Sequence, residues 1–319
     1  MNVTVWGGRG SRPVPLSPKA IRSKIATVVQ RIRPSDIESP ESRERFLSSL
    51  PQWLFGTVGG NTACVQVDLD ERNTIVFDAG SGIIEFGLRQ RGRRPMPREY
   101  HIFFTHFHYD HVQGLPFFVP MYDPRVTLHF YSPLPNVREI LAQQMRHPYF
   151  PVQMEEKVAD QFRFHHLTDS EIELFGARVR WRELNHPGRA FGYRIDHRGA
   201  SFGYVTDVEL KSEDFERTAE NSAFFEDLDA MILDTQYTLG EAIDKYSWGH
   251  SSFSLGVEFA SAWRARRLLL FHHEPLYDDK KLDHNVNSAQ WYARRIGDER
   301  LQVDLAWEGR TIAVERSDR

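Results

Sequence analysis

The segment His106-Phe107-His108-Tyr109-Asp110-His111 brings four side chains that can bind a metal ion within six positions. It follows Ile102-Phe103-Phe104, an apolar run that predicts a short strand. Because the side chains of an extended chain alternate between its two sides, His106 and His108 are expected to point the same way and to share one ion.

Asp110 and His111 come where the chain must turn into 112–115, so they would face a second point a few Å away. Neutral imidazoles and a carboxylate suit zinc, and also iron or manganese. Four such groups beside a strongly apolar strand would be costly to bury without a partner. A metal centre is therefore favoured over a surface cluster of histidines.

Two ions need more ligands than this segment supplies, and the chain offers them in three other places. Each candidate stands at the end of an apolar run that is followed by a turn: His186 before Pro187-Gly188, Asp207 after 204–206, and the doublet His272-His273 after 268–271. One such residue alone is typical of a structural role. The placement that they share points to a common site.

The remaining apolar runs predict a protein built mainly of strands. Strands are expected at 3–6, 63–67, 74–77, 101–104, 126–131, 178–184, 192–195, 201–205, 230–233, 267–271, 301–306 and 311–314, and helices at 83–89, 137–145, 252–264 and 284–295. Strands, a helix, strands and then helices, twice over, favour two packed sheets with outer helices over an alternating βαβ fold. The Pro-bounded residues 13–56 are expected to form an insertion on the rim, either solvated or facing a substrate.

The composition excludes few classes of function. The 319 residues are 40% hydrophobic and 26% charged, with a net charge of −4, which does not indicate binding to a large nucleic acid. The single cysteine, Cys64, fits a reducing compartment. The sequence shows neither a secretory signal nor a membrane span of about 18 apolar residues. We therefore expect a cytoplasmic protein that is not associated with a membrane. The oligomeric state is left open, a homodimer included.

Taken in order along almost the whole chain, these motifs resemble the metallo-β-lactamase fold hydrolases. The resemblance implies an α/β (α+β) protein in which residues 1–319 form one four-layer αβ/βα sandwich with two divalent metal ions at one edge. The first ion would be bound by His106, His108 and His186, the second by Asp110, His111 and His272, and Asp207 would bridge both. His272 is preferred to His273 because it comes first off its strand, although the doublet leaves that choice open. Zinc is the expected metal, with manganese or iron as alternatives.

Within this family the chain resembles the phosphodiesterase branch, which includes tRNA 3′-processing endonucleases and cyclic-phosphate hydrolases. The segments 59–64, 78–80 and Gly249-His250-Ser251-Ser252 carry that likeness. It implies that His250 donates a proton to the leaving group and that Asp234 orients it. The plainer interpretation of His250, as a neighbour of a helix N-cap, is compatible with this role.

The expected chemistry is hydrolysis by metal-bound hydroxide. Two ions about 3.5–4 Å apart can clamp the attacking and leaving oxygens of a phosphodiester and lower the pKa of a bound water to about 7. A positioned acid typically adds about 10²–10⁴-fold. The expected catalytic residues are Asp110, Asp207, His250 and Asp234.

The chain departs from the tRNA endonucleases in one respect: residues 120–260 contain no flexible basic arm. The aromatic stretch 145–152 is either a lid that stacks on a base or a loop packed on the core. The turn 7–11 lacks the Gly-Lys-Ser/Thr of a nucleotide P-loop and is interpreted as a plain turn, with phosphate binding by Arg9 as the alternative.

The sequence therefore predicts a dinuclear metal-dependent phosphodiesterase for a small cyclic or nucleotide-like diester. One alternative is a lactonase or thioesterase-like hydrolase of the same fold, which the pair His250 and Asp234 disfavours. Another is a non-hydrolytic di-iron redox or oxygen-binding protein, whose flavodiiron members carry glutamate in place of His108. A binding protein with an inert metal site is the last.

Overall fold

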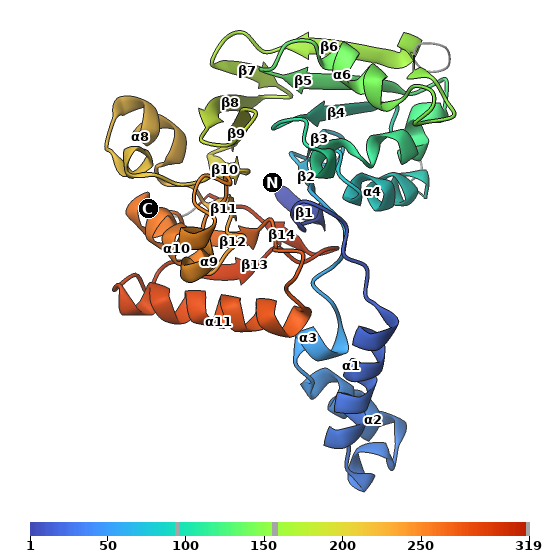
Figure 1. The fold of residues 1–319 in the computed structure, drawn as a ribbon, viewed down its shortest axis with the longest axis vertical. Helices are drawn as coiled ribbons and strands as arrows, with labels where there is room; N and C mark the ends of the chain where they lie inside the picture. The colour runs from blue at the N-terminus through green and yellow to red at the C-terminus, as the bar shows by residue number, and fades with distance from the viewer. Residues whose placement is uncertain (93–95, 155–158, 317–319) are drawn as a thin grey trace.

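Two seven-stranded sheets pack face to face, and helices cover their outer faces (Figure 1). This arrangement is seen in a computed structural model that describes residues 1–92, 96–154 and 159–316. The predicted α/β sandwich of four layers is confirmed.

The first sheet has the strand order β14-β1-β2-β3-β4-β5-β6. Its strands are β1 (Asn2–Gly7), β2 (Cys64–Asp68), β3 (Thr74–Phe77), β4 (Glu99–Phe103), β5 (Thr127–Ser132), β6 (Phe162–His166) and β14 (Thr311–Ala313). The run from β3 to β6 is parallel, so the carboxyl ends of these strands lie at one edge. The helices associated with this half are α4 (Gly82–Arg91), α5 (Tyr109–Val112) and α6 (Val137–Gln144).

The second sheet has the order β13-β12-β11-β10-β9-β8-β7. Its strands are β7 (Glu171–Leu174), β8 (Ala177–Leu184), β9 (Ala190–His197), β10 (Ala200–Val205), β11 (Ala230–Asp234), β12 (Arg267–Phe271) and β13 (Gln302–Leu305). The strands from β10 to β13 are parallel. The helices of this half are α8 (Ala219–Phe225), α9 (Leu239–Asp244), α10 (Phe253–Ala262) and α11 (Asp279–Arg295).

The period-two alternation of the strands divides the core into layers. On β4, Ile102 packs in the apolar cluster that contains Ile83 and Phe86 of α4, whereas Phe103 packs between the sheets with Tyr193 of β9. Side chains of α10 and α11, such as Val257 and Leu282, form a third cluster with the outer face of the second sheet. Strand β4 is therefore packed on both faces, which fixes where its end, and the loop that follows, must lie.

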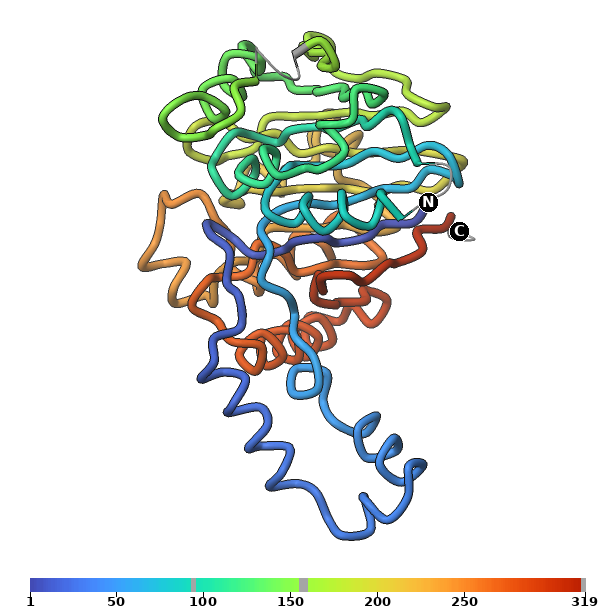
Figure 2. The backbone as a smooth tube through the Cα atoms, turned by 90° about the vertical axis from the view of Figure 1, so that its right-hand side faces the viewer, coloured from blue at the N-terminus to red at the C-terminus, as the bar shows by residue number. Residues whose placement is uncertain are grey.

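A helical projection at 18–55 extends away from the sandwich (Figures 1 and 2). It consists of α1 (Pro18–Arg31), α2 (Pro40–Ser49) and α3 (Gln52–Phe55), and no residue of α1 or α2 is buried. It is tied to the body by Lys24, whose Nζ lies 2.7 Å from Oδ2 of Asp279. That the 13–56 segment lies at the periphery agrees with its Pro-bounded, polar composition.

The expected elements are present, with several additions. Strands β6 and β7 and helices α8 and α9 had no counterpart in the sequence prediction. Helix α11 begins at Asp279 rather than 284, because the Asp278 side chain accepts from the backbone N–H of Lys281 and caps an earlier start. Short 3₁₀ turns lie at Pro34–Ile37, Leu115–Phe117, Val119–Tyr122, Ala159–Gln161 and Ser212–Phe215. Within the described ranges, every helix is too short or too polar to span a bilayer.

Candidate metal centre

The loops that follow four strands meet at one edge of the sandwich. The loop after β4 carries His106, His108, Asp110 and His111, and the loops after β8, β10 and β12 carry His186, Asp207 and His272. Since the carboxyl ends of parallel strands share an edge, segments far apart in sequence converge here. The structure thus brings together all seven residues that were expected to bind metal.

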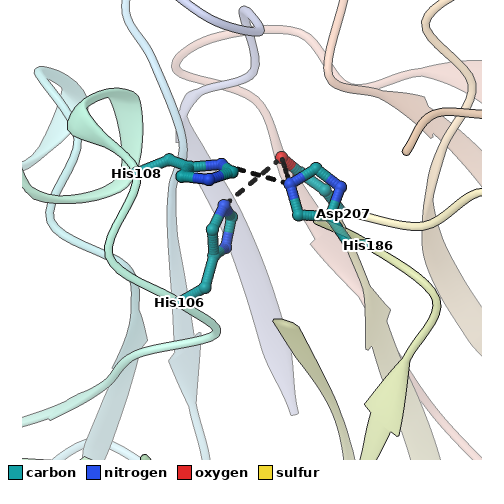
Figure 3. A group of neighbouring side chains, drawn as sticks. All are labelled: His106, His108, His186 and Asp207. Atoms are coloured by element: carbon teal, nitrogen blue, oxygen red, sulfur yellow. Dashed lines mark hydrogen bonds and ion pairs between the residues drawn. The ribbon is translucent and has the colours of Figure 1, made fainter. Parts of the chain in front are cut away.

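These seven residues form two groups that share one carboxylate. The first is His106, His108, His186 and Asp207 (Figure 3), and the second is Asp110, His111, Asp207 and His272. Within each group, one potential ligand atom per residue lies within 4.8 Å of the others. Oδ2 of Asp207 stands between them, 3.6 Å from Nε2 of His106 and 3.2 Å from Nε2 of His272.

Three of the five imidazoles are held by a neighbour on the side away from the site. The Nδ1–H of His111 donates to Oδ2 of Asp78 at 2.8 Å, that of His186 donates to the Gly249 carbonyl at 2.8 Å, and that of His272 donates to Oε1 of Gln236 at 3.0 Å. Metal-binding histidines characteristically donate their second N–H in this way, which fixes the tautomer and leaves Nε2 free.

The donor set fits metal ions. Nε2 of His106 and Nε2 of His111 are buried and have no hydrogen-bond partner among the residues that the structure describes. A buried polar atom without a partner is costly, and a bound cation would remove that cost. His108 presents Nδ1, which lies 3.1 Å from Nε2 of His186, so both nitrogens face the same point.

The electrostatics of the centre favour positive charge beside the carboxylates. Burial opposes ionisation of Asp207, but His272 and His111 outweigh it and hold its pKa well below the usual range. Burial likewise opposes protonation of His272, yet Asp207 and a hydrogen bond to Asp110 raise its pKa to about 9. In contrast, burial and the neighbouring His111 keep the pKa of His106 well below its usual value. Positive charge beside the buried carboxylates is therefore favourable, and metal ions would supply it.

The contacts of the two side chains distinguish the members of the doublet 272–273, in which His272 has a φ of 59°. His272 reaches Oδ2 of Asp110 at 3.1 Å, whereas Nε2 of His273 lies 3.3 Å from the Ala306 carbonyl. His272, not His273, therefore stands with the other candidate ligands.

The turn 7–11 contacts the centre through its backbone. The backbone N–H of Ser11 donates to Oδ2 of Asp110 at 2.7 Å. A Cβ on Gly10 would lie 2.6 Å from the ring of His272, so only glycine permits this approach. Arg9 is buried and donates to the carbonyls of Gly59 and Tyr277. Its guanidinium is thus committed to structure, which supports the plain-turn interpretation over phosphate binding.

His250 and Asp234 lie beside the second group. Nδ1 of His250 is 2.7 Å from Oδ2 of Asp234, and the His250 ring stacks on His272 with centroids 4.7 Å apart. His250 also precedes the cap of α10, where Oγ of Ser252 accepts from the N–H of Leu255. The helix-cap neighbourhood is therefore present, and the proton-donor role of His250 is compatible with it.

Two residues that position ligands were assigned no such role from the sequence, although Asp78 lies in the segment 78–80 that carries the likeness to the phosphodiesterase branch. Asp78 is fully buried and accepts hydrogen bonds from Thr105, His111 and Tyr204. Gln236 fixes His272 and donates from its amide to Glu274. The signal that could have identified Asp78 is its place directly after the apolar strand β3.

The cavity over the centre has a volume of about 360 Å³. It is lined by residues from the turn 7–11 and from the loops that carry the ligands: Ser11, Phe107, His108, Tyr109, Asp110, Asp207, His250 and His272. The 145–152 stretch contributes none of these. There Met145 is buried and Phe150 meets Phe117 edge to face at 5.6 Å, so the stretch packs as a structured loop.

Residues 73–273 match a family model described as the beta-lactamase superfamily domain. The match spans more than half of the chain, so the protein belongs to this family, whose members are metal-dependent hydrolases. The resemblance seen in the sequence is thereby confirmed. No curated protein matches the chain by sequence.

Solved structures share the fold over nearly the full length. A diphosphatase of the PhnP family is 20% identical, with 99% of this chain and 98% of that chain covered and a TM-score of 0.62. The short form of human tRNase Z is 18% identical, with coverages of 99% and 100% and a TM-score of 0.61. Zn²⁺-bound PqqB from Methylobacterium extorquens is 15% identical, with coverages of 98% and 100% and a TM-score of 0.63. At these identities the likeness shows the fold.

Proposed function

We propose that this hydrolase is a dinuclear phosphodiesterase that cleaves a small cyclic or nucleotide-like phosphodiester. The observation that carries the proposal is His250, which lines the same cavity as Asp207 and His272 and is hydrogen-bonded to the buried Asp234. A hydrolase that expels an alkoxide needs a proton donor at this place, in addition to its metal ions.

The ligand assignment follows from the two groups. His106, His108 and His186 would hold one divalent ion, Asp110, His111 and His272 the other, and Asp207 would bind both. When bound, such ions supply Lewis-acid activation of the phosphoryl group and an activated water at neutral pH. Zinc suits this set of imidazoles and carboxylates, and manganese or iron can take its place.

His250 would deliver the proton. Because Asp234 accepts the Nδ1–H, the opposite nitrogen, Nε2, is the atom available to hydrogen-bond the leaving oxygen. Asp234 is itself fixed, since it is fully buried and accepts the backbone N–H groups of Val208 and Gln236. The carboxylate thus sets the tautomer and orientation of the ring before substrate arrives.

The cavity favours a small substrate. Its volume of about 360 Å³ is at the lower end of the range for small-molecule sites, which is roughly 300–1,000 Å³. Tyr109 lines the cavity and is 80% exposed, so its ring offers a face on which a base could stack. A small diester is therefore a better fit than a large RNA, in a protein that we expect to act in the cytoplasm.

The test combines metal analysis with a substrate screen of the purified protein. We expect about two ions at the centre, and hydrolysis of bis(p-nitrophenyl) phosphate and of at least one cyclic nucleotide. A protein that hydrolyses only lactones or thioesters would overturn the phosphodiesterase proposal and leave the metal-dependent hydrolase intact. An iron-type absorption band without hydrolysis would favour the di-iron alternative.

A further inference from the structure

A second group of histidines lies on β4, β5 and β6, away from the metal centre. His101 and His129 are directly opposite each other in the parallel pair β4–β5, and His165 lies on β6. The rings form a ladder, with centroids 4.5 Å apart for His101 and His129 and 5.3 Å apart for His129 and His165. Because His101 and Phe103 are two residues apart on one strand, the ladder faces the second sheet.

One nitrogen of each of two rings is held by a neighbour. Nδ1 of His101 lies 2.9 Å from the Tyr131 hydroxyl, and Nδ1 of His129 lies 3.0 Å from Nε2 of His165. When both Nδ1 atoms carry the proton, each donates to its neighbour and leaves Nε2 with a free lone pair. This is the arrangement in which histidines bind metals.

The opposite nitrogens are left without partners. Nε2 of His101 and Nε2 of His129 are buried atoms with no hydrogen-bond partner within the described residues, and His101 is only 7% exposed. Packing alone does not explain two unsatisfied nitrogens in one cluster, because each one lost its hydrogen bonds to water on folding.

A carboxylate completes the group. Oε2 of Glu99 lies 3.9 Å from Nε2 of His101. One potential ligand atom from each of Glu99, His101 and His129 lies within 4.8 Å of the other two. Since zinc sits about 2.0–2.2 Å from nitrogen and oxygen ligands, a small shift of the exposed Glu99 side chain would close such a site.

We propose that Glu99, His101 and His129 bind a divalent transition-metal cation, at a site separate from the catalytic centre. Two imidazoles and one carboxylate suit zinc, and water can complete the shell because the Glu99 side chain is 65% exposed. The ion would tie β4 to β5 near the amino-terminal ends of these strands. The catalytic ligands follow the carboxyl end of β4, so the two sites lie at opposite ends of one strand.

The experiment uses zinc alone as the probe. Full-length wild type and the variant His129→Asn are dialysed against the same buffered zinc concentration, and bound zinc per chain is measured by mass spectrometry. We expect the variant to bind one equivalent less and to keep its hydrolytic activity. The matched control is His166→Asn on β6, whose Nε2 faces the Pro133 carbonyl, and it should bind as much zinc as wild type.

A second variant tests the same site by a substitution at an exposed position, so that the result does not depend on whether His129→Asn folds. Glu99→Gln changes an exposed side chain, so the protein should fold normally while its affinity for the extra equivalent falls at least tenfold. Equal zinc content in wild type and His129→Asn would overturn the proposal. The comparison rests on a difference of one equivalent, so it is independent of how many ions the catalytic centre holds.

Discussion

Nδ1 of His250 lies 2.7 Å from Oδ2 of Asp234, and the carboxylate is fully buried while the imidazole reaches the cavity. Asp234 is the last residue of β11, a fully buried interior strand of the second sheet, so the carboxylate of the pair is held in place by the fold. A buried carboxylate that orients a partly accessible histidine is the arrangement of a positioned proton donor.

Replacing His250 by alanine should therefore slow the release of a poor leaving group. For a diester that expels an alkoxide, we expect kcat to fall by about 10²–10⁴-fold. For bis(p-nitrophenyl) phosphate the loss should be much smaller, because p-nitrophenolate leaves without a proton. Steady-state kinetics on both substrates measures this, with His166→Ala as the control. An equal loss on both would assign His250 to structure or metal binding instead.

Asp78 should matter for metal affinity although it touches no ion. Its carboxylate accepts the Nδ1–H of His111 and also anchors Thr105. Asp78→Asn weakens that orientation, and loss of such a supporting contact typically costs about 10–100-fold in metal affinity. Competition with a chromophoric chelator measures the change. Asp68→Asn, at the end of β2, is the control, and unchanged affinity in Asp78→Asn would contradict the assigned role.

The sequence predicts those parts of the site whose residues lie close together in the chain or follow a repeated local pattern. The segment 106–111 carries four potential ligands within six positions, so no tertiary information was needed to find it. His186 and Asp207 were found because strand ends that share an edge leave a repeated pattern of an apolar run, a polar residue and a turn. The place of His272 directly after the strand favoured it over His273 but left the choice open, and only the contacts of the folded chain separate the two residues.

The missed features are those that exist only in the folded chain. Asp78 acts on a histidine 33 positions away, and Gln236 acts on one 36 positions away. Neither spacing is a motif. Strand β7 was missed for another reason: its residues alternate between exposed and half-buried at the edge of the second sheet, so it lacks a strong apolar run.

Gly10 provides a steric test of the position of His272. Alanine at position 10 would place its Cβ 2.6 Å from the imidazole, so the ring must move away from Asp110. We expect overpacking to cost about 1–3 kcal/mol in the free energy of unfolding and one ion to be lost or weakened. Gly240→Ala in α9, where a new Cβ meets nothing within 4 Å, should leave both properties near wild type. Chemical denaturation and metal analysis read out the two effects, and a Gly10→Ala protein with wild-type metal content would show that His272 is not a ligand.

Metal removal should destabilise the protein, because buried nitrogen and carboxylate atoms of the centre would then lack a cation. Without ions, Nε2 of His106 and Nε2 of His111 stay buried without a hydrogen-bond partner among the described residues, and Asp207 has histidines as its neighbouring counter-charges. Since a ligand that binds only the folded state stabilises it, zinc at 100 times its Kd should add about 2.7 kcal/mol per site to the free energy of unfolding.

The measurement is the rise in Tm of chelator-treated protein when zinc is added. It is made in His129→Asn, so that only the catalytic centre contributes. Calcium prefers oxygen ligands and should give little rise. In Asp207→Ala, which removes the carboxylate shared by both groups, the zinc-dependent rise should largely disappear, and its persistence would show that Asp207 does not link two ions.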